Sequence, residues 1–369
     1  MTDISVSSGN DFFIVSDNLS NALNQASFKD EIKLSDALVK PSPKVKTSLS
    51  GIFLSDVSEK DERWDTHKFK AEIVSKMYSE CEEFYKRSVR IDNCSSLLEF
   101  NQIPDEQGDT SLKLSSADCC RCRQCPVCQW RRSLKWQARF IEALRVISGD
   151  FPKARFIFLT LTVRNCEITE LRETLTWMNH AWKKLTLRSQ FPAIGWVKCV
   201  EVTRNSDDET AHPHFHALLM VKSGYFGASY VSQKEWRSLW QDCLKVNYEP
   251  QVNVQAIKPV KGALDLSNGS LDSQMVKAIL ETSKYAVKEG DLVADREWLY
   301  ELTRQLHKTR AIATGGIFKA YLSEKDMEPD DLVHISEDSS EETSEPSEDE
   351  ARLRAAWRRK EQRYSMLSS

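Results

Sequence analysis

The pattern of hydrophobic and polar positions changes its period near residue 155 of the 369-residue chain. Between Trp64 and Arg90 apolar residues recur at roughly helical spacing, which predicts an amphipathic helix. The segments RFIFLTLTV (155–163) and IGWVKCVEVT (194–203) have the β-branched and aromatic composition of strands. Further helices are expected near 170–187, 232–244, 271–287 and 295–308, and further strands at 212–221 and 251–257. The order β-α-β-β-α-β-α predicts an α+β fold, an antiparallel sheet with helices on one face as in ferredoxin-like proteins.

Composition divides the chain into four regions. Residues 1–60 are rich in Ser, Asp, Asn and Lys and are predicted to form a flexible arm. Residues 61–150 are predicted to be a helical region with a cysteine cluster, and residues 151–323 the α+β domain. Residues 324–369 are expected to be a disordered acidic tail with a short basic end, ARLRAAWRRKEQR, whose composition is compatible with a helix.

The charge of the chain is unevenly distributed. Residues 324–350 hold thirteen acids and one lysine, so the formal net charge of −4 leaves about +8 on the remainder. A basic body is compatible with a polyanionic partner. The N-terminus lacks the pattern of a secretory signal, and no apolar stretch is long enough to span a bilayer. Ten cysteines without an export signal therefore indicate reduced thiols or metal ligands, and a cytoplasmic protein with no membrane partner.

Five cysteines fall within ten residues, at 119–128. The C-x-x-C spacing of Cys122, Cys125 and Cys128 can present pairs of thiolates to one Zn²⁺ ion, with Cys119 or Cys120 completing the set. We expect a structural zinc site formed by Cys119, Cys122, Cys125 and Cys128. The alternative interpretation is a group of buried free thiols.

A basic and aromatic segment, WRRSLKW, follows the cysteines at 130–136. Arg131, Arg132 and Lys135 alternate with tryptophans, a composition suited to phosphate contacts and base stacking. The segment is a candidate DNA-binding surface, and a solvated helix face is the alternative.

Three histidines occupy alternate positions in AHPHFHALLM, residues 211–220. On a strand His214 and His216 point to one face, and Phe215 points to the other. A hairpin through the polar segment 204–211 would bring Glu201 beside them. Two imidazoles and a carboxylate suit a divalent ion with open positions for substrate oxygens. Two polar neighbours that satisfy one another are the alternative.

The segment ETSKYAVKEGD, residues 281–291, supplies a candidate nucleophile. On a helix Glu281 and Tyr285 share one face, and Lys284 and Lys288 lie on a neighbouring face. A tyrosine flanked by lysines can attack a metal-bound phosphate, because the cations neutralise the phosphate charge. Taken alone, the same segment is also an ordinary helix end.

Three motifs occur together and in order: FLTLT (158–162), HPHFHALLMV (212–221) and KYAVKEGD (284–291). Their combination resembles the replication initiators of rolling-circle plasmids typical of Gram-positive bacteria, within the HUH endonuclease superfamily. CPVCQWRRSLKW (125–136) and TRAIATGGIFK (309–319) resemble further segments of that family. The resemblance covers roughly residues 64–323.

The resemblance implies that His214 and His216 bind Mg²⁺ or Mn²⁺ and that Tyr285 cuts one strand of the plasmid origin, presented as single-stranded or cruciform DNA. A 5′-phosphotyrosine and a free 3′-OH would result, and a host helicase and DNA polymerase would then act. Glu281 stands where this single-tyrosine subgroup has a glutamate. Glu201 as third ligand is a geometric expectation. Ala286 replaces a proline common in the family, a change that alters no reacting group.

Two other functions are compatible with parts of this pattern. A conjugative relaxase or transposase of the same superfamily would share the histidine strand. A non-catalytic, zinc-containing DNA-binding regulator would account for the cysteines and the basic surface. It would leave the Glu281/Tyr285 segment and the histidine strand without a role.

Overall fold

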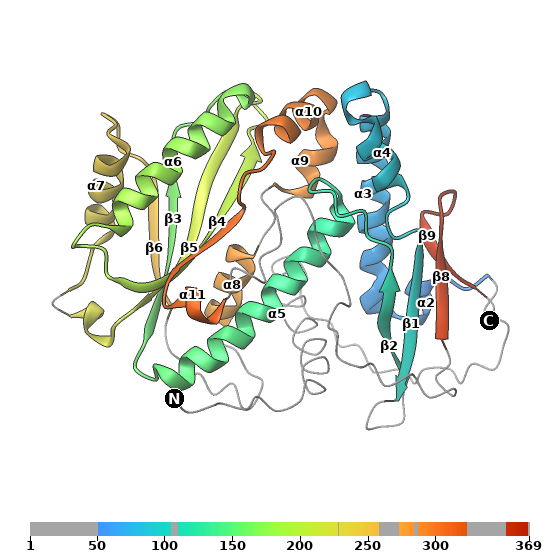
Figure 1. Cartoon of the computed structure of the whole chain (residues 1–369), viewed down its shortest axis with the longest axis horizontal. Coiled ribbons are helices and arrows are strands. Elements are labelled where there is room, and N and C mark those ends of the chain that lie inside the picture. Colours follow the sequence, from blue (N-terminus) through green and yellow to red (C-terminus); the bar gives the residue numbers. More distant parts are fainter. Residues whose placement is uncertain are drawn as a thin grey trace, which may run out of the picture. The chain divides into compact units, whose positions relative to one another are not determined.

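The computed structural model describes residues 51–104, 110–227, 229–257, 273–283, 287–322 and 352–367. They divide into two compact units (Figure 1). Unit 1 contains the described residues of Ser133–Val287 and Thr309–Met327. Unit 2 contains those of Ser35–Arg132, Lys288–Lys308 and Glu328–Ser369. Among all described residues, none of the helices is both long enough and apolar enough to cross a membrane.

Unit 1 is built on a five-stranded sheet of order β6-β3-β5-β4-β7, in which every neighbouring pair is antiparallel. The strands are β3 (Arg155–Thr162), β4 (Ala193–Arg204), β5 (Ala211–Val221), β6 (Val252–Ile257) and β7 (Ile312–Gly316). The predicted α+β fold with an antiparallel sheet is confirmed. Strand β7 was not predicted, because its sequence IATGG has two glycines and little of the β-branched composition of a strand.

Helices cover both faces of this sheet, so the expectation that they lie on one face was wrong. The helices of unit 1 are η3 (Ile168–Glu170), α6 (Leu171–Thr186), η4 (Ser223–Phe226), α7 (Gln233–Leu244), α8 (Ser273–Thr282), α11 (Phe318–Tyr321) and most of α5 (Pro126–Asp150). Trp182 of α6 and Trp240 of α7 pack against Phe215 on one face. Residues of α5, α8 and α11 share a core cluster with Leu218 and Met220 on the other. Every residue of β5 from Phe215 to Val221 is buried, so both faces of this part of the strand are covered.

Two glycines of the segment TRAIATGGIFK have a steric role. A Cβ atom on Gly315 would lie 2.2 Å from the ring of Trp196 on the neighbouring strand. Gly316 has φ +58°, a conformation that favours glycine, and an added Cβ would meet the carbonyl oxygen of Ile194 at 2.3 Å. The pair therefore lets β7 approach β4 closely before the chain turns into α11.

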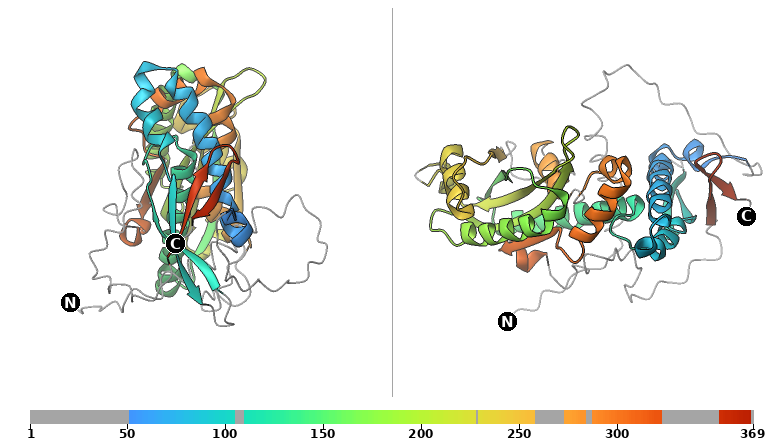
Figure 2. Two further views of the ribbon diagram at one scale, coloured as in Figure 1. Left: turned by 90° about the vertical axis from the view of Figure 1, so that its right-hand side faces the viewer. Right: turned by 90° about the horizontal axis from the view of Figure 1, so that it is seen from above.

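Unit 2 combines helices with a four-stranded sheet of order β2-β1-β8-β9, visible beside the helices in Figure 2. Its elements are α2 (Leu54–Val57), η1 (Glu59–Asp61), α3 (Glu62–Ser79), η2 (Glu82–Phe84), α4 (Tyr85–Asp92), β1 (Leu97–Pro104), β2 (Thr110–Ala117), α9 (Glu289–Ala294), α10 (Arg296–Gln305), β8 (Arg352–Arg358) and β9 (Arg363–Leu367). The single helix expected over 64–90 is two helices, α3 and α4. The region expected to be helical also contains the β1–β2 hairpin, and α2 lies within the expected flexible arm, of which residues 1–50 are outside the described residues.

The basic C-terminal end, whose composition is compatible with a helix, is not helical: it forms strand β8 and leads into β9. Strand β8 pairs with β1, with Phe100 opposite Leu353. Leu353 and Ala355 are buried while Arg352 and Arg354 are exposed, an alternation with the period of a strand. The many alanine and arginine residues concealed this period, because both have high helix propensity. The acidic residues 324–350 lie outside the described residues.

Candidate functional site

The β4–β5 hairpin brings Glu201, His214 and His216 together on one face of the sheet. Glu201 lies directly opposite His214 in the antiparallel register. Its Oε2 atom is 3.0 Å from His214 Nε2 and 2.9 Å from His216 Nε2. The three ligand atoms lie within 4.8 Å of one another, and Phe215 packs on the opposite face. The expected juxtaposition of these three side chains is therefore present.

The far side of each imidazole is held by a hydrogen bond. His214 Nδ1 donates to the backbone carbonyl of His212 at 3.2 Å. His216 Nδ1 lies 3.1 Å from Thr160 Oγ1, and the ring of Phe158 stacks on His216 with centroids 5.6 Å apart. Thr160 and Phe158 belong to FLTLT on β3, where Thr160 is directly opposite His216. These contacts fix both rings with Nε2 towards Glu201, as supporting residues do for metal ligands.

The surroundings of Glu201 favour its ionised form. Burial of Glu201 raises its pKa, but the hydrogen bonds from His214 and His216 outweigh burial and hold the pKa well below its usual range. Two octahedral ligand atoms at right angles, with bonds of about 2.1 Å, are about 3.0 Å apart. The observed separations fit a divalent ion bound to these residues.

Helix α8 ends at Thr282, so the helix expected to reach residue 287 is shorter than predicted. The hydroxyls of Thr282 and Ser283 donate to the carbonyls of Ala278 and Ile279 at 2.9 Å and 2.6 Å, in competition with further backbone turns. The carbonyl of Glu281 accepts a hydrogen bond from Cys199 Sγ at 3.3 Å. Cys199 lies on β4, two residues before Glu201.

The chain beyond α8 returns to the same strand. Val287 forms a parallel bridge with Val202, the residue after Glu201. Lys284 and Tyr285 lie between these two contacts, outside the described residues. Helix α8 ends three residues before Tyr285, and the expectation that Glu281 and Tyr285 share one helix face concerns a residue outside the described ones and stays a prediction.

The basic residues expected to contact DNA lie in different settings. Lys288 is exposed and precedes α9. The guanidinium of Arg131 lies over the rings of Trp64 and Trp130, at 5.4 Å and 5.6 Å from their centroids, and so has a packing role in unit 2. Arg132 and Lys135 are half-buried on α5.

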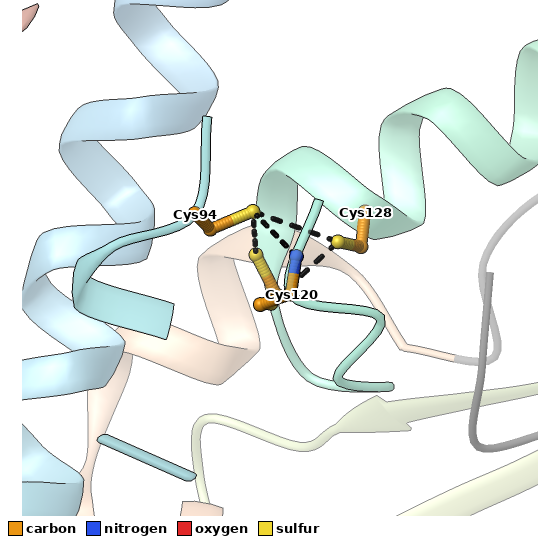
Figure 3. A group of neighbouring side chains, drawn as sticks. Cys94, Cys120 and Cys128 are labelled. Carbon is orange, nitrogen blue, oxygen red and sulfur yellow. Dashed lines mark hydrogen bonds between the residues drawn. The ribbon is translucent and has the colours of Figure 1, made fainter. Parts of the chain in front are cut away.

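A second group of candidate ligands lies in unit 2, where four sulfur atoms lie within 4.8 Å of one another. They belong to Cys94, Cys120, Cys125 and Cys128, three of which are labelled in Figure 3. This set shares Cys125 and Cys128 with the expected one but contains Cys94 and Cys120 in place of Cys119 and Cys122. No sequence spacing points to Cys94, which lies 26 residues before Cys120 and joins the group only because α4 ends beside the segment after β2.

Comparison with known proteins gives the family. Residues 111–365 match the family model described as Rep_1, replication protein. The chain belongs to the replication protein family. The resemblance to replication initiators, read from three short motifs, is thereby confirmed at the level of the family. No solved structure matches the chain significantly.

Several relatives named Protein rep cover most of the chain. The protein of Streptococcus pneumoniae serotype 2 is 35% identical over 291 residues, which are 76% of this chain and 86% of the relative. Those of Lactiplantibacillus plantarum and Bacillus amyloliquefaciens are 37% and 34% identical and are covered over 88% and 87% of their lengths. This member of the family therefore spans nearly the whole of its relatives.

Proposed function

We propose that this protein initiates rolling-circle replication of a plasmid by nicking one strand of the origin, with Tyr285 as nucleophile. The observation that carries the proposal is the group of buried Glu201, buried His216 and half-buried His214, in which Nε2 of both imidazoles faces one carboxylate oxygen. Mg²⁺ or Mn²⁺ fits these imidazole and carboxylate ligands, and Zn²⁺ fits the thiols of unit 2. The family supports replication as the process in which the site acts.

The path of the chain around residue 285 supports the assignment of the nucleophile. Ser283 is bonded to the end of α8, and Val287 is bridged to Val202 beside Glu201. One residue spans at most about 3.6 Å, so the Cα atom of Tyr285 is within about 7 Å of the Cα atoms of both anchors. The described residues on either side of Tyr285 therefore contact the end of α8, which carries Glu281, and the strand that carries Glu201.

The proposed reaction is a transesterification. The Tyr285 phenolate oxygen attacks the scissile phosphorus, the bond to the 3′ oxygen breaks, and that oxygen leaves as a 3′-OH after gaining a proton. The divalent ion, when bound, polarises the phosphate for this attack. The 5′-phosphotyrosine conserves the energy of the phosphodiester, so no nucleotide is consumed, in agreement with the absence of a G-x-x-x-x-G-K-[ST] motif from the sequence. The 3′-OH then primes a host polymerase behind a host helicase.

Glu281 is proposed to end the round of replication. The Glu281 carboxylate can accept a proton from water but cannot form a second phosphotyrosine. The activated water would hydrolyse the phosphodiester and so release the displaced strand. Its backbone contact with Cys199 ties it to the strand that carries Glu201, which supports a role near the same phosphate.

A supercoiled plasmid carrying the origin of the replicon is the direct test. The wild-type protein should nick it only with Mg²⁺ or Mn²⁺ and form an adduct that mass spectrometry assigns to Tyr285. Tyr285→Phe should lose nicking and adduct together, whereas Tyr230→Phe, a change at an exposed tyrosine, should keep both. Glu281→Ala should nick normally but yield products longer than one plasmid unit.

Each outcome tests a different part of the proposal. An adduct on another residue, or nicking that persists in Tyr285→Phe, would contradict the assignment of the nucleophile. A shift of the origin DNA in a gel with no metal-dependent nick from the wild type would indicate a DNA-binding regulator. Monomeric circles made by Glu281→Ala at the wild-type rate would remove Glu281 from the mechanism.

A further inference from the structure

The four-cysteine group of unit 2 has no part in strand cleavage, yet its geometry is that of a metal site. The sulfur of Cys94 lies 3.6 Å from those of Cys125 and Cys128, and Cys120 and Cys128 are also 3.6 Å apart. A disulfide would require about 2.05 Å, and all ten cysteines of the chain are free. Tetrahedral Zn²⁺ with bonds of about 2.3 Å places its sulfurs about 3.8 Å apart. The observed spacing fits the zinc site.

Backbone amides point at two of these sulfurs. The amide of Cys120 donates to Cys94 Sγ at 3.3 Å, and the amide of Cys122 donates to Cys120 Sγ at 3.4 Å. Donors of this kind favour the thiolate over the thiol, because they stabilise its negative charge. Cys94, Cys125 and Cys128 are almost completely buried, so water cannot supply that stabilisation.

A buried cation lies next to the group. Lys68 of α3 is fully buried, and its Nζ donates to the carbonyls of Cys94 at 2.6 Å and Asp92 at 2.8 Å. Within the described residues this ammonium makes no hydrogen bond or salt bridge to a carboxylate, and both of its hydrogen bonds go to backbone carbonyls. The negative groups near this ammonium are the carboxylates of Glu72 and Asp92 and, when ionised, the sulfurs of Cys94 and Cys125. Because a buried charge is costly unless opposite charge lies close to it, thiolates at Cys94 and Cys125 would stabilise the buried Lys68.

We propose that Cys94, Cys120, Cys125 and Cys128 bind one Zn²⁺ and that Lys68 is the buried counter-charge of this site. Four thiolates around Zn²⁺ carry a net charge of −2, which one ammonium offsets in part. The ligands come from the end of α4, the segment after β2 and the start of α5. One ion therefore joins three segments of unit 2 that sequence spacing does not relate.

The ligand set is tested by metal content of the full-length chain. The wild-type protein, purified under reducing conditions, should hold one zinc per chain by elemental analysis. Cys94→Ser should lower that value or weaken zinc binding at least tenfold. Cys119→Ser and Cys122→Ser are matched controls from the same cysteine-rich segment and should retain full zinc.

Cobalt gives a second measurement that does not depend on activity. Co²⁺ in the site should show the absorption of a tetrahedral tetrathiolate, and Cys94→Ser should weaken its sulfur-to-metal band. A wild-type chain without zinc would overturn the proposal, as would loss of zinc from Cys119→Ser together with full zinc in Cys94→Ser.

The role of Lys68 is tested by a measurement that would not change if this lysine were only structural. Zinc should raise the Tm of the chelator-treated wild-type protein, and Lys68→Met should reduce this rise and weaken zinc binding about tenfold. Without zinc, Lys68→Met should be at least as stable as the wild type, because a buried cation has been replaced by an apolar chain. Lys76→Met, at an exposed position of the same helix, is the control. An unchanged zinc-dependent Tm rise in Lys68→Met would remove Lys68 from the site.

Discussion

At the scale of single residues, the proposed catalytic site depends on side chains that touch the histidines from behind. Thr160 and the carbonyl of His212 hold the Nδ1 atoms, and Phe158 stacks on His216. Thr160 belongs to the motif FLTLT, and none of the side chains of that motif suggests a catalytic role. The register of β3 against β5 shows that Thr160 supports a candidate ligand, because it lies opposite His216.

Thr160→Val should weaken metal binding without unfolding the protein. Valine keeps the shape of threonine but removes the hydroxyl, so His216 loses the contact that orients its ring. We expect about tenfold weaker Mn²⁺ binding, about 1.4 kcal/mol, measured by isothermal titration calorimetry. Thr160→Ser, which keeps the hydroxyl, should bind Mn²⁺ nearly as well as the wild type. Equal Kd values for the valine variant and the wild type would contradict this positioning role.

At the scale of elements, the C-terminal hairpin of β8 and β9 is an integral part of unit 2. Tyr364 of β9 is fully buried. Its hydroxyl donates to the carbonyl of Ser95 at 2.6 Å, and its amide donates to Asp65 Oδ1 at 2.8 Å. Ser95 follows Cys94, so the last strand of the chain supports the segment that carries a proposed zinc ligand.

Tyr364→Ala should therefore destabilise the protein strongly. Loss of the buried ring and of the hydrogen bond from its hydroxyl to Ser95 should cost about 3–5 kcal/mol, whereas the backbone hydrogen bond to Asp65 is kept. Tyr230→Ala, at a tyrosine that is 54% exposed, should stay within about 0.5 kcal/mol of the wild type. Urea unfolding followed by circular dichroism measures both. Similar unfolding midpoints for the two variants would show that the hairpin contributes little.

At the scale of the whole molecule, charge is separated along the chain. The acidic residues 324–350 carry a net charge of −12, and the rest of the chain carries about +8. Since this segment stands between α11 and β8 in sequence, it is tied to both units by the chain itself. We expect the negative charge of this segment to compete with DNA for the basic residues.

Neutralising the acids of 324–350 should strengthen binding to DNA of unrelated sequence. Substituting Asn and Gln for Asp and Glu keeps the length of the connection to β8, which a deletion would not. The gain should be largest at low salt and shrink as salt rises, because phosphate contacts act through counterion release. Fluorescence anisotropy with a labelled random duplex at several salt concentrations measures it. Equal affinities at low salt would exclude masking by the acidic segment.

The sequence alone determined the antiparallel α+β core and the Glu201, His214 and His216 group. Both depend on local information: alternation along a strand places His214 and His216 on one face, and a short polar turn forces the preceding strand to pair beside them. The end of α8 was harder to predict from the sequence. The hydroxyls of Thr282 and Ser283 compete with backbone hydrogen bonds within a residue pattern that is otherwise typical of a helix.

Only the tertiary structure decided the features that join distant segments. Cys94 lies far from the cysteine-rich segment in sequence, and its place among the sulfurs depends on how α4 packs against the segment after β2. The basic end is a strand because β1 offers it an edge, which outweighs the helix propensity of its alanines and arginines. Lys68 reads as one more surface lysine of an amphipathic helix. Helical spacing places it on the buried face of α3 with Trp64 and Ala71, but only the tertiary structure supplies the carbonyls of Asp92 and Cys94 that its ammonium contacts there.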